Sequence, residues 1–156
     1  MSKRVGMIYK LIPQELEGTY AFDKISSDDI HELSISMLEA FKDTTDFDGE
    51  TLEELNEEIY SVIESTFGTF ISDASFQIKQ NGEIAAVILI SLYKDKPFIS
   101  ELFTAKKYLK LGMASNLLKK SINTLLNLGY KDLVLYVHPE NVEAINLYKK
   151  IGFSAL

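Results

Sequence analysis

The sequence predicts an α+β (α/β) fold, with a mixed sheet that begins antiparallel and becomes parallel at one strand-to-helix turn. Three observations lead to this prediction: two capped helices early in the chain, an Asn-Gly hairpin signal in the middle, and a strand–helix–strand run near the end. At 156 residues the chain fits one domain, 1–156, long enough to bury roughly 70% of its unfolded surface. It contains no internal repeat, low-complexity tract or linker.

Two alternating stretches open the chain. Residues 4–11 place apolar side chains on one side and predict a strand or ordered arm, which Pro13 ends. Residues 19–25 alternate in the same way and predict a second strand. We therefore treat residues 1–18 as an extra N-terminal strand or arm.

Two helices follow, and each opens on a capping box. The spacing is Ser/Thr-x-x-Asp/Glu, in Ser26 with Asp29 and in Thr51 with Glu54. Apolar residues recur at helical spacing behind both caps, so we expect helices over 30–42 and from Leu52 to an end at Gly68.

The middle of the chain predicts a hairpin. Asn81-Gly82 joins strands at 75–80 and 83–93, because a type I′ turn needs positive φ at both central positions. The second strand is apolar on both faces and belongs in the middle of the sheet. A strand at 97–104 should pair beside it.

The last third predicts a strand–helix–strand unit and a final helix. An amphipathic helix over 111–128, closed by Gly129, leads into a continuously apolar strand over 132–137. After it, a helix runs from Asn141 to Gly152, and the chain stops four residues later.

Composition excludes several classes of protein. The absence of cysteine removes disulfides, thiolate zinc sites and a cysteine nucleophile, and fits a reducing cytoplasm. Two histidines are too few for a histidine-rich metal site, so no metal is expected. No apolar run reaches ~18 residues without a charge, and the N-terminus lacks a signal-peptide core. A net charge of −7 argues against nucleic-acid binding and favours a cationic partner.

The turn at 106–114 has the features of an anion site. A strand runs into it and a helix N-terminus follows, where unpaired N–H groups and the helix dipole favour negative charge. Gly112 and Ala114 are small enough to let phosphates approach the backbone. Taken alone, the same residues also fit an ordinary strand-to-helix turn.

Two motifs together resemble those of the Gcn5-related N-acetyltransferase (GNAT) superfamily. NVEAINLYKKIGF, over 141–153, has the spacing Asn-x-x-Ala-x-x-x-Tyr-x-x-x-Gly-Phe, and Leu109-x-x-Gly112-x-Ala114 is similar to the family's Gln/Arg-x-x-Gly-x-Gly/Ala loop. The order of elements also matches over about 19–156. The resemblance implies helices on both faces of the sheet and acetyl-CoA as co-substrate. It also implies direct attack by a primary amine in a ternary complex.

The resemblance implies a set of cofactor-binding residues along strand 97–104, the turn at 106–114 (called the cradle below) and the last helix. They are Leu102, Phe103, Thr104, Leu109, Lys110, Leu111, Gly112, Met113, Ala114 and Asn141. Leu109 departs from the family's Gln or Arg, so weaker cofactor binding is expected. Lys106, Lys107 and Lys110 could screen phosphate charge or be ordinary surface lysines.

The second departure is the early end of the chain, since the family continues for another strand after the final Gly-Phe. Either the C-terminal strand is short or truncated, or another segment covers the sheet edge. Residues 4–11 and a neighbouring subunit of a homodimer are the two candidates.

Two residues are candidates for catalysis. Glu101, predicted to face the same side as Ile99 and Phe103, is the only carboxylate within strand 97–104 and could act as a base through water. It could equally be a half-exposed strand glutamate. Tyr148 corresponds to the family's general acid, which protonates the departing thiolate. Asn141 could bond the pantetheine arm or simply cap its helix, and His138 has no proposed role.

The acceptor remains open at this stage. Eight acids and no base lie over 43–58, and they form either a solvated face or an attraction for a cationic primary amine, with Phe47 meeting its carbon chain. A cationic small molecule or a peptide amine is expected. The alternatives are a non-catalytic acyl-CoA-binding or regulatory module and a mononucleotide binder. For the latter, both glycine-rich phosphate-binding motifs are missing.

Overall fold

The computed structural model describes residues 3–66 and 68–156, in which eight strands form one mixed sheet. The strands are β1 (Val5–Lys10), β2 (Asp23–Lys24), β3 (Thr69–Phe70), β4 (Phe76–Gln80), β5 (Glu83–Tyr93), β6 (Lys96–Thr104), β7 (Asp132–Val137) and β8 (Ser154–Ala155). The helices are α1 (Ile30–Phe41), α2 (Leu52–Ile63), α3 (Met113–Asn127) and α4 (Val142–Ile151). None of the described helices is both long and apolar enough to cross a membrane.

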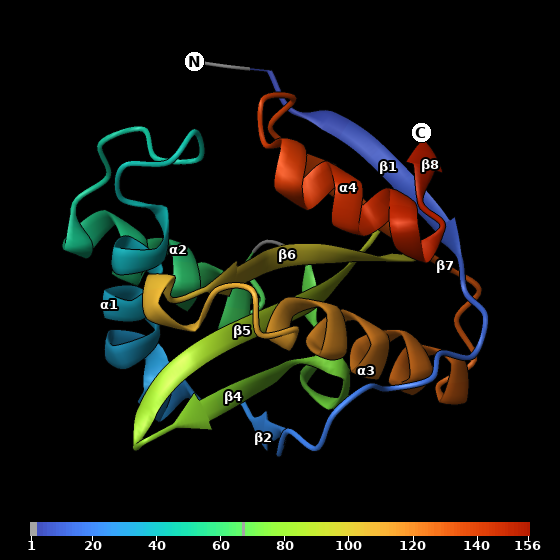
Figure 1. Cartoon of the computed structure of the whole chain (residues 1–156), viewed down its shortest axis with the longest axis horizontal. Coiled ribbons are helices and arrows are strands. Elements are labelled where there is room, and N and C mark those ends of the chain that lie inside the picture. Colours follow the sequence, from blue (N-terminus) through green and yellow to red (C-terminus); the bar gives the residue numbers. More distant parts are fainter. Residues whose placement is uncertain (1–2, 67) are drawn as a thin grey trace.

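The sheet confirms the predicted change from antiparallel to parallel pairing. Its order is β2-β4-β5-β6-β7-β1-β8, with β3 beside β5, and in the described residues only β6 and β7 pair in parallel. The long strand β5 lies mid-sheet, as its two apolar faces predicted. Figure 1 shows β5 and β6 crossing the middle of the molecule, with β7 and β1 beyond them.

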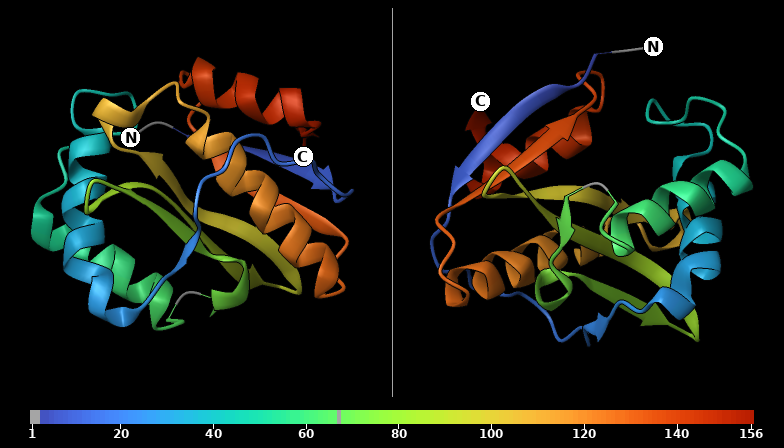
Figure 2. Two further views of the ribbon diagram at one scale, coloured as in Figure 1. Left: turned by 60° about the horizontal axis from the view of Figure 1, so that its bottom comes forward. Right: turned by 180° about the vertical axis from the view of Figure 1, so that it is seen from behind.

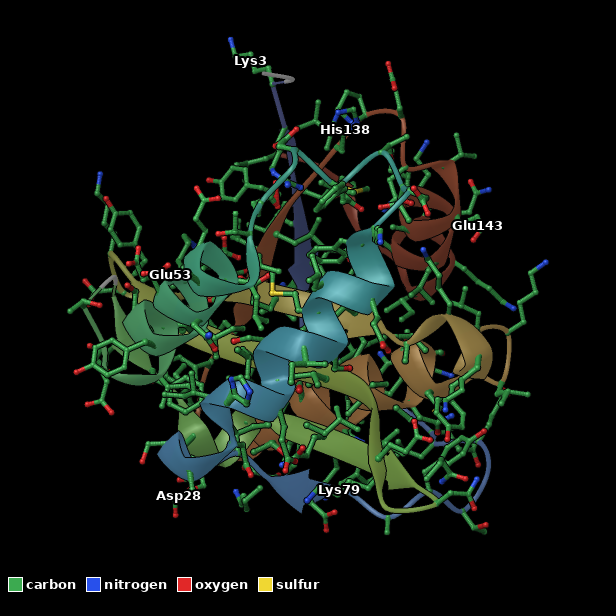
Figure 3. All side chains as sticks on the ribbon, turned by 90° about the vertical axis from the view of Figure 1, so that its left-hand side faces the viewer. Lys3, Asp28, Glu53, Lys79, His138 and Glu143 are labelled. Carbon is green, nitrogen blue, oxygen red and sulfur yellow. The ribbon has the colours of Figure 1, made fainter. Side chains whose placement is uncertain are left out.

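Helices cover both faces of the sheet (Figure 2). One buried cluster joins α1 and α2 to β5 and β6, through residues such as Leu33, Ile59 and Phe103. The other joins α3 to the opposite face, through residues such as Leu117 and Ile122. Seen from the α1 side, both N-terminal helices lie across the sheet and carry exposed acids such as Glu53 (Figure 3).

The predicted turns and caps are present. Asn81 and Gly82 have φ of 54° and 77°, as the hairpin turn requires. Both capping boxes form, since the Ser26 and Thr51 side chains accept backbone N–H bonds and the acid three residues later returns one.

Three element boundaries were predicted wrongly. The second strand is only Asp23–Lys24, because Tyr20 and Phe22 pack against the core as part of an irregular segment. Helix α2 ends at Ile63, and Gly68 instead occupies a turn against β5, where a Cβ would lie 2.7 Å from the Leu92 carbonyl oxygen. Helix α3 begins at Met113 rather than at 111, because Gly112 takes the N-cap position with φ of 80°.

Strand β1 covers the outer edge of β7. The two pair antiparallel from Val5 opposite Val137 to Lys10 opposite Asp132, and β8 then pairs with β1. Tyr9 stacks on Phe153, with ring centroids 5.1 Å apart. Gly152 admits this approach, because a Cβ there would lie 2.8 Å from the Tyr9 ring. The N-terminal strand thus brings the residue before it, Arg4, to the carboxyl end of β7.

A bulge and a separation of strands open the sheet near its centre. The register of β5 with β6 shifts between Leu89 and Ile90, so that Ser100 is an extra residue. Ile99 therefore packs with the α3 cluster while Phe103 packs with the α1–α2 cluster. The prediction that Glu101 shares a face with Ile99 was wrong for this reason. Strands β6 and β7 are registered only at Phe98 and Val134, before the bulge, and two cavities lie where the strands diverge after it.

Candidate active site

Two cavities meet at the carboxyl ends of β6 and β7. The cradle cavity, about 500 Å³, lies over the turn before α3, and the acidic cavity, about 710 Å³, lies between β6, the loop before α2 and the end of β7. They share six lining residues: Phe41, Asp46, Leu102, Asn141, Ala144 and Tyr148. A molecule in one cavity can therefore touch a molecule in the other.

The cradle presents backbone N–H groups without a side-chain cap. Gly112 holds the left-handed conformation at the N-cap of α3, and no side chain bonds the helix start there. The N–H groups of Met113, Ala114 and Ser115 precede the first intrahelical bond, which Asn116 makes to the Gly112 carbonyl at 3.0 Å. Free donors at a helix N-terminus fit a phosphate-bearing ligand such as CoA.

Nine of the ten residues predicted to bind a cofactor line the cradle cavity. They are Leu102, Phe103, Thr104, Leu109, Lys110, Gly112, Met113, Ala114 and Asn141. Leu111 does not line it, because its side chain is 53% exposed and turned to solvent. The Leu111 carbonyl instead accepts a hydrogen bond from the Tyr20 hydroxyl, which ties the cradle to the irregular segment before β2.

The three cradle lysines differ in their partners. Lys107 pairs with Glu83 at 2.6 Å and lies away from the cavity. Lys106 lines the cavity but reaches Asp43, 4.0 Å away, and the Lys42 carbonyl. Lys110 lines the cavity in the positive-φ conformation, at 64°. Lys110 and Lys106 are therefore the two that can face a phosphate.

Tyr148 lies in the wall between the cavities. It projects from α4, is 7% exposed, and packs its ring 5.7 Å from that of Phe153. Burial raises the pKa of its phenol, the nearby Asp46 carboxylate raises it further, and Arg4 opposes both effects. The hydroxyl therefore stays protonated at neutral pH, as a hydrogen-bond donor to a leaving group must.

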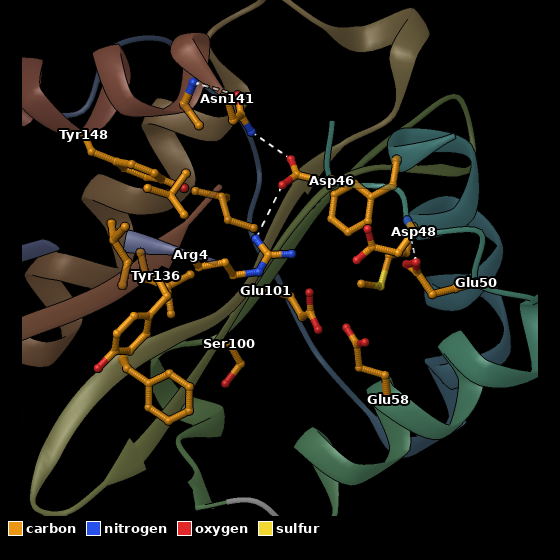
Figure 4. A pocket seen from close by; sticks show the side chains of 18 of the residues that line it. Arg4, Asp46, Asp48, Glu50, Glu58, Ser100, Glu101, Tyr136, Asn141 and Tyr148 are labelled. Carbon is orange, nitrogen blue, oxygen red and sulfur yellow. Dashed lines mark hydrogen bonds and ion pairs between the residues drawn. The ribbon is translucent and has the colours of Figure 1, made fainter. Parts of the chain in front are cut away.

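Glu101 points from β6 into the acidic cavity, toward Glu58 on α2 (Figure 4). Burial raises the pKa of the Glu101 carboxyl well above its ordinary value, and a hydrogen bond to Glu58 and the charge of Glu58 raise it further. Arg4 lowers this pKa, and Asp46 raises it slightly. Glu101 is therefore closer to a neutral-pH base than an ordinary glutamate is.

The acidic cavity carries six carboxylates and, among the described residues, one cation. The acids are Asp46, Asp48, Glu50, Glu54, Glu58 and Glu101, and the cation is Arg4. No group of three acidic or histidine side chains in residues 3–66 and 68–156 is placed to hold a metal ion. Phe47, which the sequence analysis offered as an acceptor contact, is half-buried outside this lining.

Asp46 is held from two sides. Its Oδ2 accepts from the Asn141 side-chain amide at 2.8 Å, and its Oδ1 lies 3.4 Å from the Arg4 guanidinium. The Asn141 oxygen also accepts from the Ala144 N–H at 3.1 Å, so this side chain is the N-cap of α4. One residue thereby joins the start of α4 to the acidic loop, residues 42–51, which precedes α2.

Three residues of this site, Arg4, Tyr20 and Glu58, were not predicted from the sequence. Residues before a strand and in an irregular segment carry no spacing that places them, and Glu58 was one of eight similar acids. His138, for which no role was predicted, is buried, and its Nδ1 accepts from the Glu140 N–H at 3.2 Å.

Comparison with known sequences gives one family and one related enzyme. Residues 32–153 match the sequence model of the acetyltransferase (GNAT) family. The [ribosomal protein bS18]-alanine N-acetyltransferase of Escherichia coli strain K12 is 31% identical over 80 residues, which cover 51% of this chain and 54% of that protein. The matched segment spans about half the length of this curated relative.

Comparison with solved structures shows the same fold at low sequence identity. A GCN5-related N-acetyltransferase from Sphaerobacter thermophilus has a TM-score of 0.75 at 15% identity, over 100% of this chain and 50% of that one. The PaiA N-acetyltransferase from Thermoplasma acidophilum, in complex with coenzyme A, has a TM-score of 0.70 at 19% identity, over 88% and 91%. The ribosomal-protein-S18-alanine N-acetyltransferase from Escherichia coli has 0.66 at 21%, over 86% and 77%.

Proposed function

The chain belongs to the acetyltransferase (GNAT) family, and on that premise we propose that it moves the acetyl group of acetyl-CoA to a primary amine. The acceptor is a cationic small molecule or a peptide amine, and it attacks the thioester directly in a ternary complex. The observation that carries this proposal is the meeting of the cradle cavity and the acidic cavity at Tyr148.

The residues of the cradle bind the nucleotide end of the cofactor in this proposal. The N–H groups at the start of α3 and the Lys110 ammonium bond phosphate oxygens. The divergence of β6 from β7 leaves β6 backbone near Phe103 and Thr104 exposed to the cavity, where an extended pantetheine arm fits beside the strand. A backbone N–H there polarises the thioester carbonyl. When bound, acetyl-CoA supplies the activated acetyl group.

The two candidate catalytic residues act at opposite ends of the reaction. Glu101, ionised, takes a proton from the incoming amine through water, since an alkyl amine has a pKa near ~10.4 and is protonated at neutral pH. Tyr148 donates from its hydroxyl to the departing sulfur, which becomes a thiol. The raised pKa of Tyr148 keeps that proton available, and the raised pKa of Glu101 makes it a stronger base.

Charge supports a cationic acceptor. Six carboxylates face one guanidinium in the described lining of the acidic cavity, so a cation gains electrostatic energy on entering and an anion loses it. The curated relative is named for acetylating an alanine of a ribosomal protein, which supports a peptide N-terminal amine as one acceptor to test. A polyamine or an aminoglycoside-like compound has the same charge and is the other.

The direct test is release of free thiol from acetyl-CoA with a panel of amines: short alkyl diamines, an aminoglycoside, and peptides with free and blocked N-termini. Amine-dependent thiol release with an acetylated product, identified by mass spectrometry, would support the proposal. Hydrolysis at the same rate without any amine would contradict it.

A second candidate, a non-catalytic acyl-CoA-binding or regulatory module, is favoured by one residue. Leu109 stands where the family's signature has Gln or Arg, and it lines the cradle cavity with an apolar side chain, so this position gives the cradle no polar side-chain group. Acetyl-CoA binding without turnover on any amine of the panel would select this candidate. Leu109→Gln should then tighten binding without creating activity.

A further inference from the structure

We propose that Glu58 and Glu101 form a proton-sharing pair that receives the acceptor's ammonium group, whose arrival replaces the shared proton. This inference rests on the proposed function, and it assigns a positioning role to Glu58. It also narrows the acceptor to an alkylammonium with at least two N–H groups on the charged nitrogen.

The geometry of the two side chains is the first support. Glu58 extends from α2 and Glu101 from β6, and their carboxyl groups point toward each other in the acidic cavity (Figure 4). The bulge at Ser100 turns Glu101 to this face of the sheet, away from Ile99. Because an ionised carboxylate has no donor, two facing carboxyl groups can hydrogen-bond to each other only when one of them carries a proton.

The second support is that the carboxyl groups of Glu58 and Glu101 have no other hydrogen-bond or ion-pair partner among the described residues. Asp46 bonds Asn141 and Arg4, Glu50 accepts the Asp48 N–H at 2.6 Å, and Glu54 accepts the Thr51 N–H at 2.9 Å. In residues 3–66 and 68–156, no N–H group or cation bonds the carboxyl of Glu58 or of Glu101. Asp48 also has a carboxylate without such a partner, but only Glu58 and Glu101 point toward each other, so we assign the ligand to these two acids.

The charges around Glu101 come from three separate elements. Glu58 on α2 and Asp46 on the acidic loop raise the pKa of Glu101, and Arg4, before β1, lowers it. Burial is the largest of these effects. Glu58 is exposed and Glu101 is half-buried, and burial raises the pKa of Glu101, so we place the shared proton on Glu101.

Entry of an ammonium group changes this balance. The bound state is R–NH₃⁺ between two ionised carboxylates, and the proton that was shared leaves to solvent, one for each acceptor bound. Glu101, now ionised, next accepts a proton from the ammonium nitrogen, and the neutral amine that results attacks the thioester. Over a full cycle R–NH₃⁺ and the acetyl thioester give the acetamide, the thiol and one proton in solution.

The Glu58–Glu101 pair should select an acceptor by its number of N–H donors as well as by its positive charge. Each of the two carboxylates can accept a hydrogen bond from the same nitrogen only if that nitrogen carries at least two N–H groups. The nitrogen must also be positively charged, because its charge stabilises the second ionised carboxylate once the shared proton has left. A primary alkylammonium supplies both, and so does a secondary one. An arylamine is neutral at pH 7, and a tetraalkylammonium has charge without N–H groups, so both should fail to displace the proton.

The test follows the Glu101 carboxyl directly, by ¹³C NMR titration of the full chain labelled at glutamate side chains, with Glu101→Gln to assign its signal. We expect the Glu101 titration midpoint to fall in Glu58→Gln, because the like charge is removed. The matched control is Glu57→Gln, an exposed neighbour on α2 outside the cavity lining, which should leave the midpoint unchanged. An unchanged midpoint in Glu58→Gln would overturn the pair.

The ligand arm of the test uses simple cations at equal concentration. n-Butylammonium should lower the Glu101 midpoint in wild type more than tetramethylammonium does, and this difference should vanish in Glu58→Gln. Equal effects of the two cations would show only general screening and would overturn the ammonium site.

Kinetics separate this proposal from the proposed function. If acetyl transfer occurs, Glu58→Gln should raise KM for alkyl amines and move the rise of kcat/KM to lower pH, with Glu58→Asp between it and wild type. Acetyl transfer with an unchanged pH profile in Glu58→Gln would support the acetyltransferase activity and contradict the role of Glu58. If the Glu101 titration midpoint responds to n-butylammonium but no amine is acetylated, the result would support the ammonium site and contradict the acetyltransferase activity.

Discussion

Asn141 donates a 2.8 Å hydrogen bond from its side-chain amide to the carboxylate of Asp46, a residue 95 positions earlier in the chain. The same side chain caps α4 through the Ala144 N–H. Since Asp46 and Asn141 both line the two cavities, this bond fixes the acidic loop against the helix that carries Tyr148.

Two substitutions at Asn141 can separate its role as the N-cap of α4 from its hydrogen bond to Asp46. Asn141→Ala removes both, and loss of an N-cap costs about 1 kcal/mol, which should lower Tm by about 2–4 °C. Asn141→Ser keeps a capping oxygen but is too short to reach Asp46, so it should keep Tm and still raise KM for cationic acceptors. Equal losses of Tm in the two variants would show that the Asp46 bond, and not the cap, carries the stability.

The local structure of this protein was predictable where one short signal decides it. Asn81-Gly82, the two capping boxes and the Asn141 cap all depend on residues within four positions of each other, and all are present. The length of α2 was misjudged, because the glycine at 68 serves a close approach to Leu92 rather than a helix end.

The site was harder to predict, because its parts come from distant segments. Motif spacing found Gly112, Tyr148 and Asn141, which lie on two consecutive strand–helix units. Arg4 enters the site only because β1 pairs with β7, and Glu58 meets Glu101 only because a bulge turns β6. Neither contact has a signature in the sequence near those residues.

Acetyl-CoA should stabilise the folded chain. At about 100 times its Kd a ligand adds about 2.7 kcal/mol, and for a domain of this size that raises Tm by about 5–10 °C. Gly112→Asp should abolish the shift, because it places a negative charge at the cradle. Gly129→Asp is the matched control, since Gly129 also has positive φ, 94°, but follows the other end of α3. A full shift in Gly112→Asp would place the phosphates elsewhere.

Tyr148→Phe should lower kcat by about 10–1000-fold with little change in acetyl-CoA affinity, because it deletes one hydroxyl and keeps the ring packed on Phe153. Steady-state kinetics and a Tm shift with acetyl-CoA measure the two effects separately. Tyr136→Phe, in the acidic cavity but outside the cradle cavity, should leave kcat within a few-fold of wild type. An undiminished kcat in Tyr148→Phe would make Tyr148 a packing residue.

Glu101→Gln should stabilise the protein at higher pH. The folded state holds the Glu101 proton to a higher pH than the unfolded state does. Unfolding therefore releases a proton between the ordinary glutamate range and the raised folded pKa, and the wild type loses stability as pH rises through that window. Urea unfolding from pH 4 to pH 8 should show a stability gain in Glu101→Gln that grows with pH, and no such trend in Glu57→Gln. A gain that shrinks as pH rises would mean that the folded protein favours ionised Glu101.

The acids of the loop before α2 should attract a cationic acceptor through their negative charge and so raise its kcat/KM. Asp46 and Asp48 line the acidic cavity, so Asp46→Asn/Asp48→Asn should lower kcat/KM for cationic amines, with a smaller effect on neutral ones. Salt screens exposed charges over about 8–10 Å, so raising ionic strength should shrink the advantage of wild type over the double variant. The control, Glu53→Gln/Glu57→Gln, removes the same charge from α2 residues that do not line the cavity. If both double variants lose kcat/KM equally, the effect comes from net charge and the cavity acids have no special role in capture; if neither does, these acids serve only as a solvated surface.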